Sequence, residues 1–207
     1  MNTTTRSGTA APSDVGTRDR IVRTAARLMQ RQGYDGTGIK QIAQEAEATH
    51  GSVYHFFPGG KQELAIAAIR YGDEEFAAAL RDVFERYEDP AEAVMASARL
   101  LADGLRESDW VGGCPVASTA LGAAARVADI REAACTAFNH WQDLVFTALR
   151  RAGISEDNAR DLGQTVISAL EGAELAAEFA RDDAPLQAAG RHLARLINLY
   201  RQEAAAS

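Results

Sequence analysis

The hydrogen-bonding side chains between residues 49 and 57 are the part of the sequence best suited to read a polar surface. In this segment, Thr49-His50-Gly51-Ser52-Val53-Tyr54-His55-Phe56-Phe57, Val53 and Phe57 are four residues apart, so a helix can bury both on one face. The opposite face then carries groups that donate and accept hydrogen bonds, as the edges of DNA bases require. Those outward-facing residues are Thr49, His50, Ser52 and His55. Gly51 removes a side chain where the helix must approach bases closely.

Three further residues extend this candidate surface. Tyr54 offers a hydroxyl group and Lys61 an ammonium group, and such groups contact phosphates, which position a protein on DNA without reading its sequence. Thr37 is expected to cap the short helix that follows it, over 39–46, and to join the contact surface. We therefore predict that the affinity for double-stranded DNA resides in residues 17–64.

The elements that position these residues form the pattern of a helix-turn-helix. Apolar residues recur at helical spacing over 17–32, and Gly33 ends that run. Two short helices follow, over 39–46 and 50–56, separated by a three-residue joint. In such a motif the second short helix enters the major groove with its N-terminus first.

The distribution of charge agrees with this location. The whole chain has a net charge of −7, which by itself disfavours a polyanionic partner. Residues 1–61 nevertheless carry eight basic and five acidic residues, whereas residues 62–207 carry fourteen basic and twenty-four acidic ones. A polyanion is therefore expected to meet the N-terminal quarter of the chain.

Residues 17–64 resemble the N-terminal domain of the TetR family of bacterial transcriptional regulators. The matching landmarks are Gly33-Tyr34, Thr37, Ile42-Ala43, the run 51–57 and Lys61-Gln62-Glu63-Leu64. The joint Pro58-Gly59-Gly60-Lys61 and the later Gly113-Cys114-Pro115-Val116 look like the LmrA/YxaF-type branch of that family. The resemblance implies an all-helical fold with an N-terminal DNA-binding domain and a C-terminal domain for ligand binding and dimerisation.

Two positions depart from the family pattern. Glu47 stands in the joint where glycine is usual, and a left-handed backbone at a non-glycine residue costs roughly 1 kcal/mol. His50 stands where the first residue of the recognition helix is often basic, and a neutral imidazole supplies one donor and one acceptor instead of a fixed charge.

The composition predicts an all-α protein of about nine helices, because alanine is abundant and β-branched runs are scarce. We expect a disordered arm over 1–16, a three-helix helix-turn-helix domain over 17–62, and a helical ligand-binding and dimerisation domain over 63–207. With the resemblance, this organisation predicts a homodimeric regulator, favoured as a repressor over an activator. It would bind a palindromic operator and be released by a small apolar or aromatic effector.

The effector site is predicted beside a Gly-rich break in the C-terminal domain. Four residues near that break are expected to border an apolar cavity with few polar contacts: Trp110, Cys114, Phe138 and Trp141. The aromatic residues could equally be plain core, since they recur at helical spacing.

The last two predicted helices carry small and aliphatic residues at helical spacing. We predict that they form a four-helix interface between two chains, through Val166, Ala169, Leu170, Ala173, Ala177, Leu193, Leu196 and Ile197. An intramolecular core is the alternative for some of these residues.

Several other classes of protein receive little support. No apolar stretch approaches the roughly 20 residues that cross a bilayer, no signal peptide is recognisable, and two cysteines without a CxxC pair suit a reducing cytoplasm. The four histidines lack metal-ligand spacing, and no cofactor motif is present. Cys114 with His140 as a nucleophile and base lacks an activating constellation, so we do not expect an enzyme. A redox sensor using Cys114 and Cys135 remains a rival to ligand control.

Overall fold

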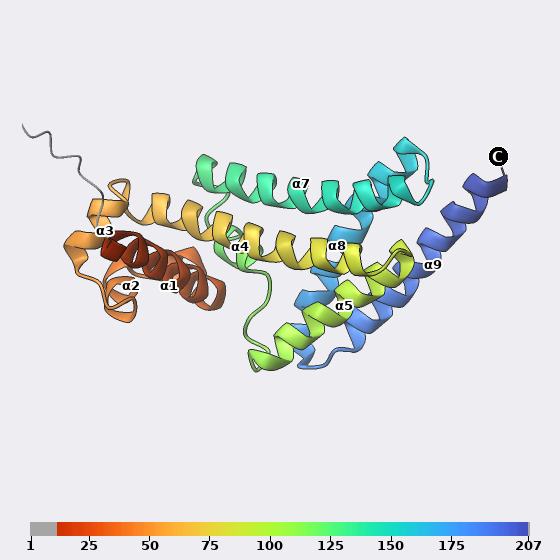
Figure 1. Ribbon diagram of the computed structural model, residues 1–207. Helices are drawn as coiled ribbons and strands as arrows, with labels where there is room; N and C mark the ends of the chain where they lie inside the picture. The colour runs from red at the N-terminus through yellow and green to blue at the C-terminus, as the bar shows by residue number, and fades with distance from the viewer. Residues whose placement is uncertain (1–11, 207) are drawn as a thin grey trace, which may run out of the picture.

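A computed structural model describes residues 12–206, and over that range the protein is built from helices connected by short loops (Figure 1). Nine helices and no strand occur in this part of the chain, which confirms the predicted all-α fold. The helices are α1 Pro12–Gly36, α2 Ile39–Glu45, α3 His50–Phe56, α4 Gly60–Arg86, α5 Pro90–Glu107, α6 Pro115–Ala120, α7 Ala128–Arg151, α8 Glu156–Ala180 and α9 Ala184–Ala206.

The first helix is longer than the apolar pattern predicts. It begins at Pro12 instead of residue 17, so the last residues of the predicted arm are helical, while residues 1–11 lie outside the described range. Proline suits this position because the first turn of a helix needs no backbone N–H. The predicted end at Gly33 is confirmed as a break, since its φ of 69° and ψ of 173° are not helical.

The three N-terminal helices pack around a small core of their own. Ile21 and Met29 of α1, Ile42 of α2 and Val53 of α3 are fully buried, and Phe57, just after α3, is 1% exposed. These are the apolar positions that helical spacing assigns to the inner face. Their burial fixes which side of α3 is turned outward.

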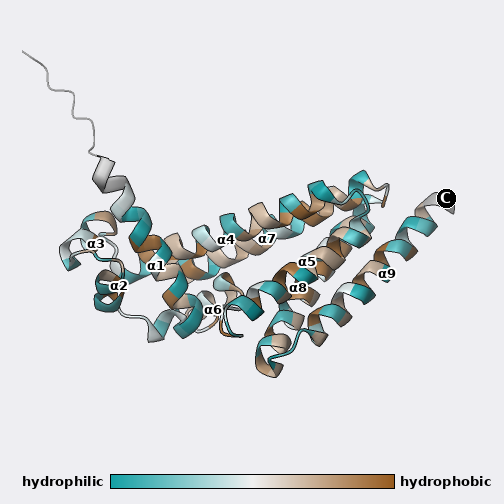
Figure 2. Ribbon diagram, turned by 60° about the horizontal axis from the view of Figure 1, so that its bottom comes forward, coloured by the Kyte–Doolittle hydropathy of each residue, from teal (hydrophilic) through white to brown (hydrophobic). Residues whose placement is uncertain are grey.

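The remaining helices form the larger part of the molecule. The long helix α4 lies beside α7, α7 packs on α8, and α5 packs on α9 (Figure 1). In Figure 2 hydrophobic segments are frequent on α5 and α8, in the middle of this part. The predicted domain boundary between residues 62 and 63 falls inside the first turn of α4, so one continuous helix joins the two parts. None of the described helices has the length and apolar character needed to cross a membrane.

Candidate DNA-binding surface and ligand cavity

The joint between α2 and α3 has the geometry that a helix-turn-helix requires. Glu47 has a φ of 50°, the left-handed conformation expected at this position despite the missing glycine. The N–H groups of Glu47 and Ala48 return to the carbonyls of Gln44 and Ala43 and thereby close the C-terminus of α2. This conformation costs roughly 1 kcal/mol at Glu47, and it permits a tight turn between two short helices.

Thr49 starts α3, as predicted. Its hydroxyl oxygen accepts a hydrogen bond from the Ser52 N–H at 3.0 Å, and the two hydroxyl oxygens lie 2.8 Å apart. Such a cap stabilises a helix by about 1 kcal/mol. The cap holds both hydroxyl groups at the N-terminus of α3, the end that a recognition helix directs into the groove.

The outer face of α3 carries the residues expected to contact bases. Thr49, His50, Gly51 and His55 are exposed, Ser52 is half-buried, and Tyr54 is 45% exposed. The His50 and Tyr54 rings meet edge to face with centroids 5.1 Å apart, so each orients the other. The fold thus brings all six onto one surface.

Lys61 is partly committed to its own domain. Its ammonium nitrogen lies 4.5 Å from the centroid of the Tyr34 ring and donates to the Asp35 carbonyl at 3.4 Å. These contacts hold the lysine beside the start of α4, and an ammonium group has three protons, so donors remain for a phosphate. Its predicted role is compatible with this position.

Thr37 cannot serve as predicted. It is fully buried, and its hydroxyl donates to the Gly33 carbonyl at 2.9 Å, so it offers no surface to DNA. Nor does it cap α2, because the N-cap position is occupied by Gly38 without a side-chain hydrogen bond. The hydroxyl instead closes the turn after α1, a local use that threonine side chains commonly find.

Two basic residues near this surface were not singled out from the sequence. Lys40 is exposed in the first turn of α2. Arg18 of α1 lies over the Phe57 ring, with its guanidinium carbon 5.3 Å from the ring centroid. The sequence offered only their charge, which does not tell a contact residue from a solvated one.

A cavity of about 260 Å³ opens between α6, α7 and α8. Most of its surface is apolar, but three glutamates of α8 also face it. The lining residues are Gly113, Cys114, Ala117, Ser118, Leu121, Phe138, Glu171, Gly172, Glu174, Leu175 and Glu178.

The glutamates of this cavity are in an unusual environment. Burial raises the pKa of Glu171 to about 7. Burial, followed by the charges of Glu171 and Glu178, raises the pKa of Glu174 to about 8. Glu174 is 5% exposed, and no described residue forms a hydrogen bond to its carboxyl group. Burial also raises the pKa of the Cys114 thiol, an effect that the charges of Glu171 and Glu174 reinforce.

Two of the four predicted effector residues line this cavity, Cys114 and Phe138. Trp141 does not, because it is fully buried against Phe76 and Phe138, with ring centroids 4.8 and 5.0 Å away. Its indole N–H has no partner among the described residues. Trp110 is half-buried in the loop before α6 and is also absent from the lining. The expectation of few polar contacts was wrong, because the glutamates were not foreseen.

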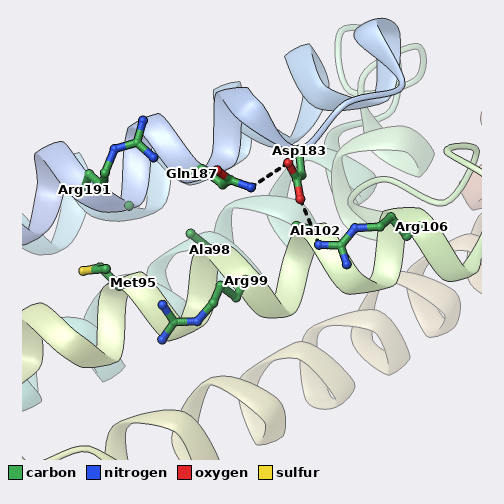
Figure 3. A pocket seen from close by; sticks show the side chains of 9 residues that line it. Met95, Ala98, Arg99, Ala102, Arg106, Asp183, Gln187 and Arg191 are labelled. Atoms are coloured by element: carbon green, nitrogen blue, oxygen red, sulfur yellow. Dashed lines mark hydrogen bonds and ion pairs between the residues drawn. The ribbon is translucent and has the colours of Figure 1, made fainter.

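A second hollow lies between α5 and α9 (Figure 3). It has a volume of about 300 Å³ and is mainly apolar. At one end Asp183 accepts from Arg106 at 2.9 Å and from Gln187 at 2.7 Å, as the dashed lines show. Neither helix packs extensively on α1, so an occupant here has no direct route to the DNA-binding helices.

Models of two families match the chain. The model described as bacterial regulatory proteins of the tetR family matches residues 21–68, and that of the LmrA/YxaF-like C-terminal domain matches residues 90–192. The chain is 35% identical over 169 residues to the HTH-type transcriptional regulator LmrA of Bacillus subtilis, covering 82% of this chain and 90% of that protein. This protein belongs to the TetR family. It is also 33% identical over 169 residues to YxaF of the same organism, with 82% and 88% covered.

Solved structures of TetR regulators share the fold. One from Chloroflexus aurantiacus is 26% identical with a TM-score of 0.74, and covers 91% of this chain and 97% of its own. One from Cytophaga hutchinsonii is 21% identical with a TM-score of 0.78, covering 93% and 98%. The TetR family consists of transcriptional regulators, which are not enzymes.

The predicted dimer residues of this TetR regulator mostly lie inside its own core. Five of them are at most 5% exposed within one chain: Val166, Leu170, Ala177, Leu193 and Ile197. Ala169, Ala173 and Leu196 are half-buried. For the five buried residues the intramolecular alternative is therefore correct. The exposed apolar side chains of α8 and α9 are others, namely Leu175, Phe179 and Leu199, which are 49%, 79% and 56% exposed.

The residues of the two rival hypotheses show no reactive arrangement. His140 is paired with Asp73, with the ring nitrogen Nδ1 2.9 Å from the carboxylate. Both cysteines are free thiols, Cys135 exposed and Cys114 half-buried. A raised pKa keeps the Cys114 thiol protonated, which disfavours both nucleophilic attack and oxidation.

Proposed function

We propose that this TetR regulator is a repressor that binds a palindromic operator as a homodimer and is released by a small effector with an apolar or aromatic body. The supporting observation is the outer face of α3. There Gly51 stands between His50 and Ser52 in the chain, and an added Cβ atom would meet only the Thr49 hydroxyl oxygen, at 3.8 Å. The fold itself does not need this glycine, whereas a closely approaching DNA groove would.

A homodimer would present two copies of α3 to successive turns of the major groove. Adjacent half-sites on one face of DNA lie about 34 Å apart. Leu175 and Phe179 are one helical turn apart on α8, so their exposed side chains lie together on one face and support an interface there. Such a regulator would act in the cytoplasm, where operator DNA is found.

The short helix α6 provides a route from the cavity to the DNA-binding helices. Cys114, Ala117 and Ser118 line the cavity at the start of α6, and the same helix packs on α1. Gln30 of α1 donates to the Gly113 carbonyl at 2.6 Å, directly before α6. An effector that binds one α6 position better than another would therefore shift α1 and the spacing of the two recognition helices.

Selection of binding sites from a pool of random DNA duplexes tests the proposal. The enriched duplexes should contain two inverted half-sites. The His50→Ala and Ser52→Ala variants should relax the preference at defined bases, each by about 1–3 kcal/mol. Asn139→Ala, an exposed polar residue on α7, is the control and should leave the selected sequence unchanged. Absence of enrichment, or the same preference in all variants, would refute the role of α3.

A further inference from the structure

The cavity between α6, α7 and α8 combines an apolar wall with carboxylates that have no counter-charge. Its lining contains Glu171, Glu174 and Glu178, and within the described residues no lysine, arginine or histidine belongs to it. Glu174 is only 5% exposed, and its carboxyl group lacks a hydrogen-bond partner in the described part of the chain. A largely buried carboxyl group without a partner favours a ligand that brings it a hydrogen-bond donor or a positive charge.

We infer that this cavity binds an organic cation, an ammonium group carried on a small apolar body. The inference rests on the proposed function, because it names the chemical class of the effector. An ammonium group supplies the positive charge that the glutamates lack, while apolar walls at Ala117 and Leu175 accept the body of the molecule. The volume of about 260 Å³ limits that body to a small one.

Phe138 strengthens the case for a cation. Its ring lines the cavity and is held from behind by the buried Trp141, with centroids 5.0 Å apart. The face of an aromatic ring attracts a quaternary or protonated amine, and rings combined with carboxylates are a common way to recognise such groups. Here the ring and the glutamates come from different helices, α7 and α8, and meet across the cavity.

A purely apolar occupant fits the cavity less well. It would exclude water from Glu174 without offering this carboxyl group a partner, and would leave Glu171 with only its hydrogen bond to Cys114. Sites with buried polar groups reject ligands that leave those groups unpaired. A metal ion is also disfavoured, since no cluster of three or more potential ligands with suitable placement occurs over residues 12–206.

The state of the glutamates without ligand agrees with this assignment. With a pKa of about 7 for Glu171 and about 8 for Glu174, both carboxyl groups are largely protonated in mildly acidic solution. A bound cation favours their ionised forms, and the released protons pass to solvent. The affinity for a ligand of fixed positive charge should therefore rise as the pH increases through 7 to 8.

A pair of isosteric probes tests the inference. Phenyltrimethylammonium and tert-butylbenzene differ only in the quaternary atom, nitrogen or carbon. Their dissociation constants are measured with the full chain at pH 8.5, by tryptophan fluorescence and by ligand-observed NMR. The cation should bind at least about tenfold more tightly than the neutral isostere. Equal affinity, tighter binding of the neutral compound, or no binding of the cation at millimolar concentration overturns the inference.

Charge-removing variants locate the effect. Glu174→Gln and Glu171→Gln should each reduce the preference for the cation by about tenfold while leaving the isostere bound as before. Glu107→Gln removes a charge from an exposed residue of α5 that does not line the cavity, and should leave the preference intact. A preference that survives in both cavity variants also overturns the inference.

Operator DNA binding, followed in the same samples, separates the two proposals. If the protein selects no operator, the proposed function fails, yet the ratio of the two probe affinities still decides the charge of the ligand. If operator binding is sound and the cation preference is absent, only the assignment of the ligand class fails.

Discussion

Gly51 shows how a single residue can serve a partner at a cost to the fold. It lies in the first turn of α3 with helical backbone, and the space around its Cβ position is open except for ordinary contact with Thr49. Glycine within a helix is less stable than alanine by up to about 1 kcal/mol. No contact among the described residues requires a glycine here, which agrees with the proposed close approach of DNA.

Replacing this glycine should therefore separate stability from affinity. Gly51→Ala is expected to raise the free energy of unfolding by up to about 1 kcal/mol, because the unfolded chain loses freedom. The same methyl group should weaken operator binding at least about tenfold by preventing close approach to the bases. Urea titration and gel-shift assays measure the two effects, and a variant that binds DNA as well as the wild type would contradict our use of α3.

Glu174 makes stability depend on pH in an unusual direction. Its pKa is about 8 in the folded protein and 4.5 ordinarily, so the folded state retains a proton that the unfolded state has lost. The stability associated with this proton is complete below pH 4.5 and declines as the pH rises towards 8. Most carboxylates act in the opposite sense, because ion pairs lower their pKa values.

We expect the melting temperature of the wild type to fall between pH 5 and 8, and that of Glu174→Gln to fall less. The amide cannot ionise, so its burial costs the same at every pH. Differential scanning calorimetry of both proteins across this range measures the difference. Parallel curves for the two proteins would show that Glu174 ionises normally in the folded state.

At the scale of elements, α6 is the helix on which the proposed regulation depends. It is short and contacts α1 on one side and the cavity on the other. Just before it, the backbone of Gly113 closely approaches Glu178, since an added Cβ atom would lie 2.6 Å from a carboxylate oxygen. The Gly113 carbonyl in turn receives the Gln30 side chain. A movement of the Glu178 carboxylate on α8 can thus displace the Gly113 backbone, and through its carbonyl the Gln30 side chain of α1.

Loss of the Gln30 side chain should weaken the response to effector more than the affinity for DNA. Gln30→Ala keeps the outer face of α3 intact, so operator affinity without ligand should change by no more than a few-fold. The factor by which a saturating effector lowers that affinity should become smaller. Coupling free energies between two sites are typically about 1–3 kcal/mol, which sets the size of the expected loss. Gln32→Ala, an exposed neighbour on α1, is the control. An undiminished response in Gln30→Ala would exclude this hydrogen bond from the pathway.

Sequence patterns predicted the helices well because apolar spacing is a local property. The cap at Thr49 was predicted for the same reason, whereas a left-handed backbone at Glu47 was considered only because the family usually has glycine there. They failed for Thr37 and Trp141, since burial depends on which distant helices cover a residue. Glu174 could have been noticed, because it stands four residues after Leu170 and three before Ala177, within the buried stripe of α8.

At the scale of the molecule, the proposed homodimer needs a surface that two chains can share. An apolar stripe in the sequence cannot distinguish a core within one chain from an interface between two, since both bury the same residue types. The structure separates them: Leu170 is 2% exposed in the single chain, whereas Phe179 is 79% exposed on the same helix.

Phe179→Asp should therefore produce folded monomers, whereas Leu170→Arg should unfold the chain. The first change puts a charge on a surface expected to be covered only by a partner, and the second puts an unpaired charge in the core. Sedimentation analysis and circular dichroism measure assembly and folding. Leu100→Asp, at a partly exposed residue of α5, is the control for a surface charge. A Phe179→Asp protein that remains dimeric would place the interface elsewhere.

The separation of the two parts along the molecule also makes it an electric dipole. The DNA-binding helices lie at one end in Figure 1, and residues 1–61 have a net charge of +3, whereas the rest of the chain has a net charge of −10. The electric field of a DNA duplex therefore orients the protein before contact, because it repels the acidic end and attracts the basic end. Fewer collisions are then wasted on the wrong orientation. Added salt, which screens that torque, should slow association even where the final contacts are unchanged.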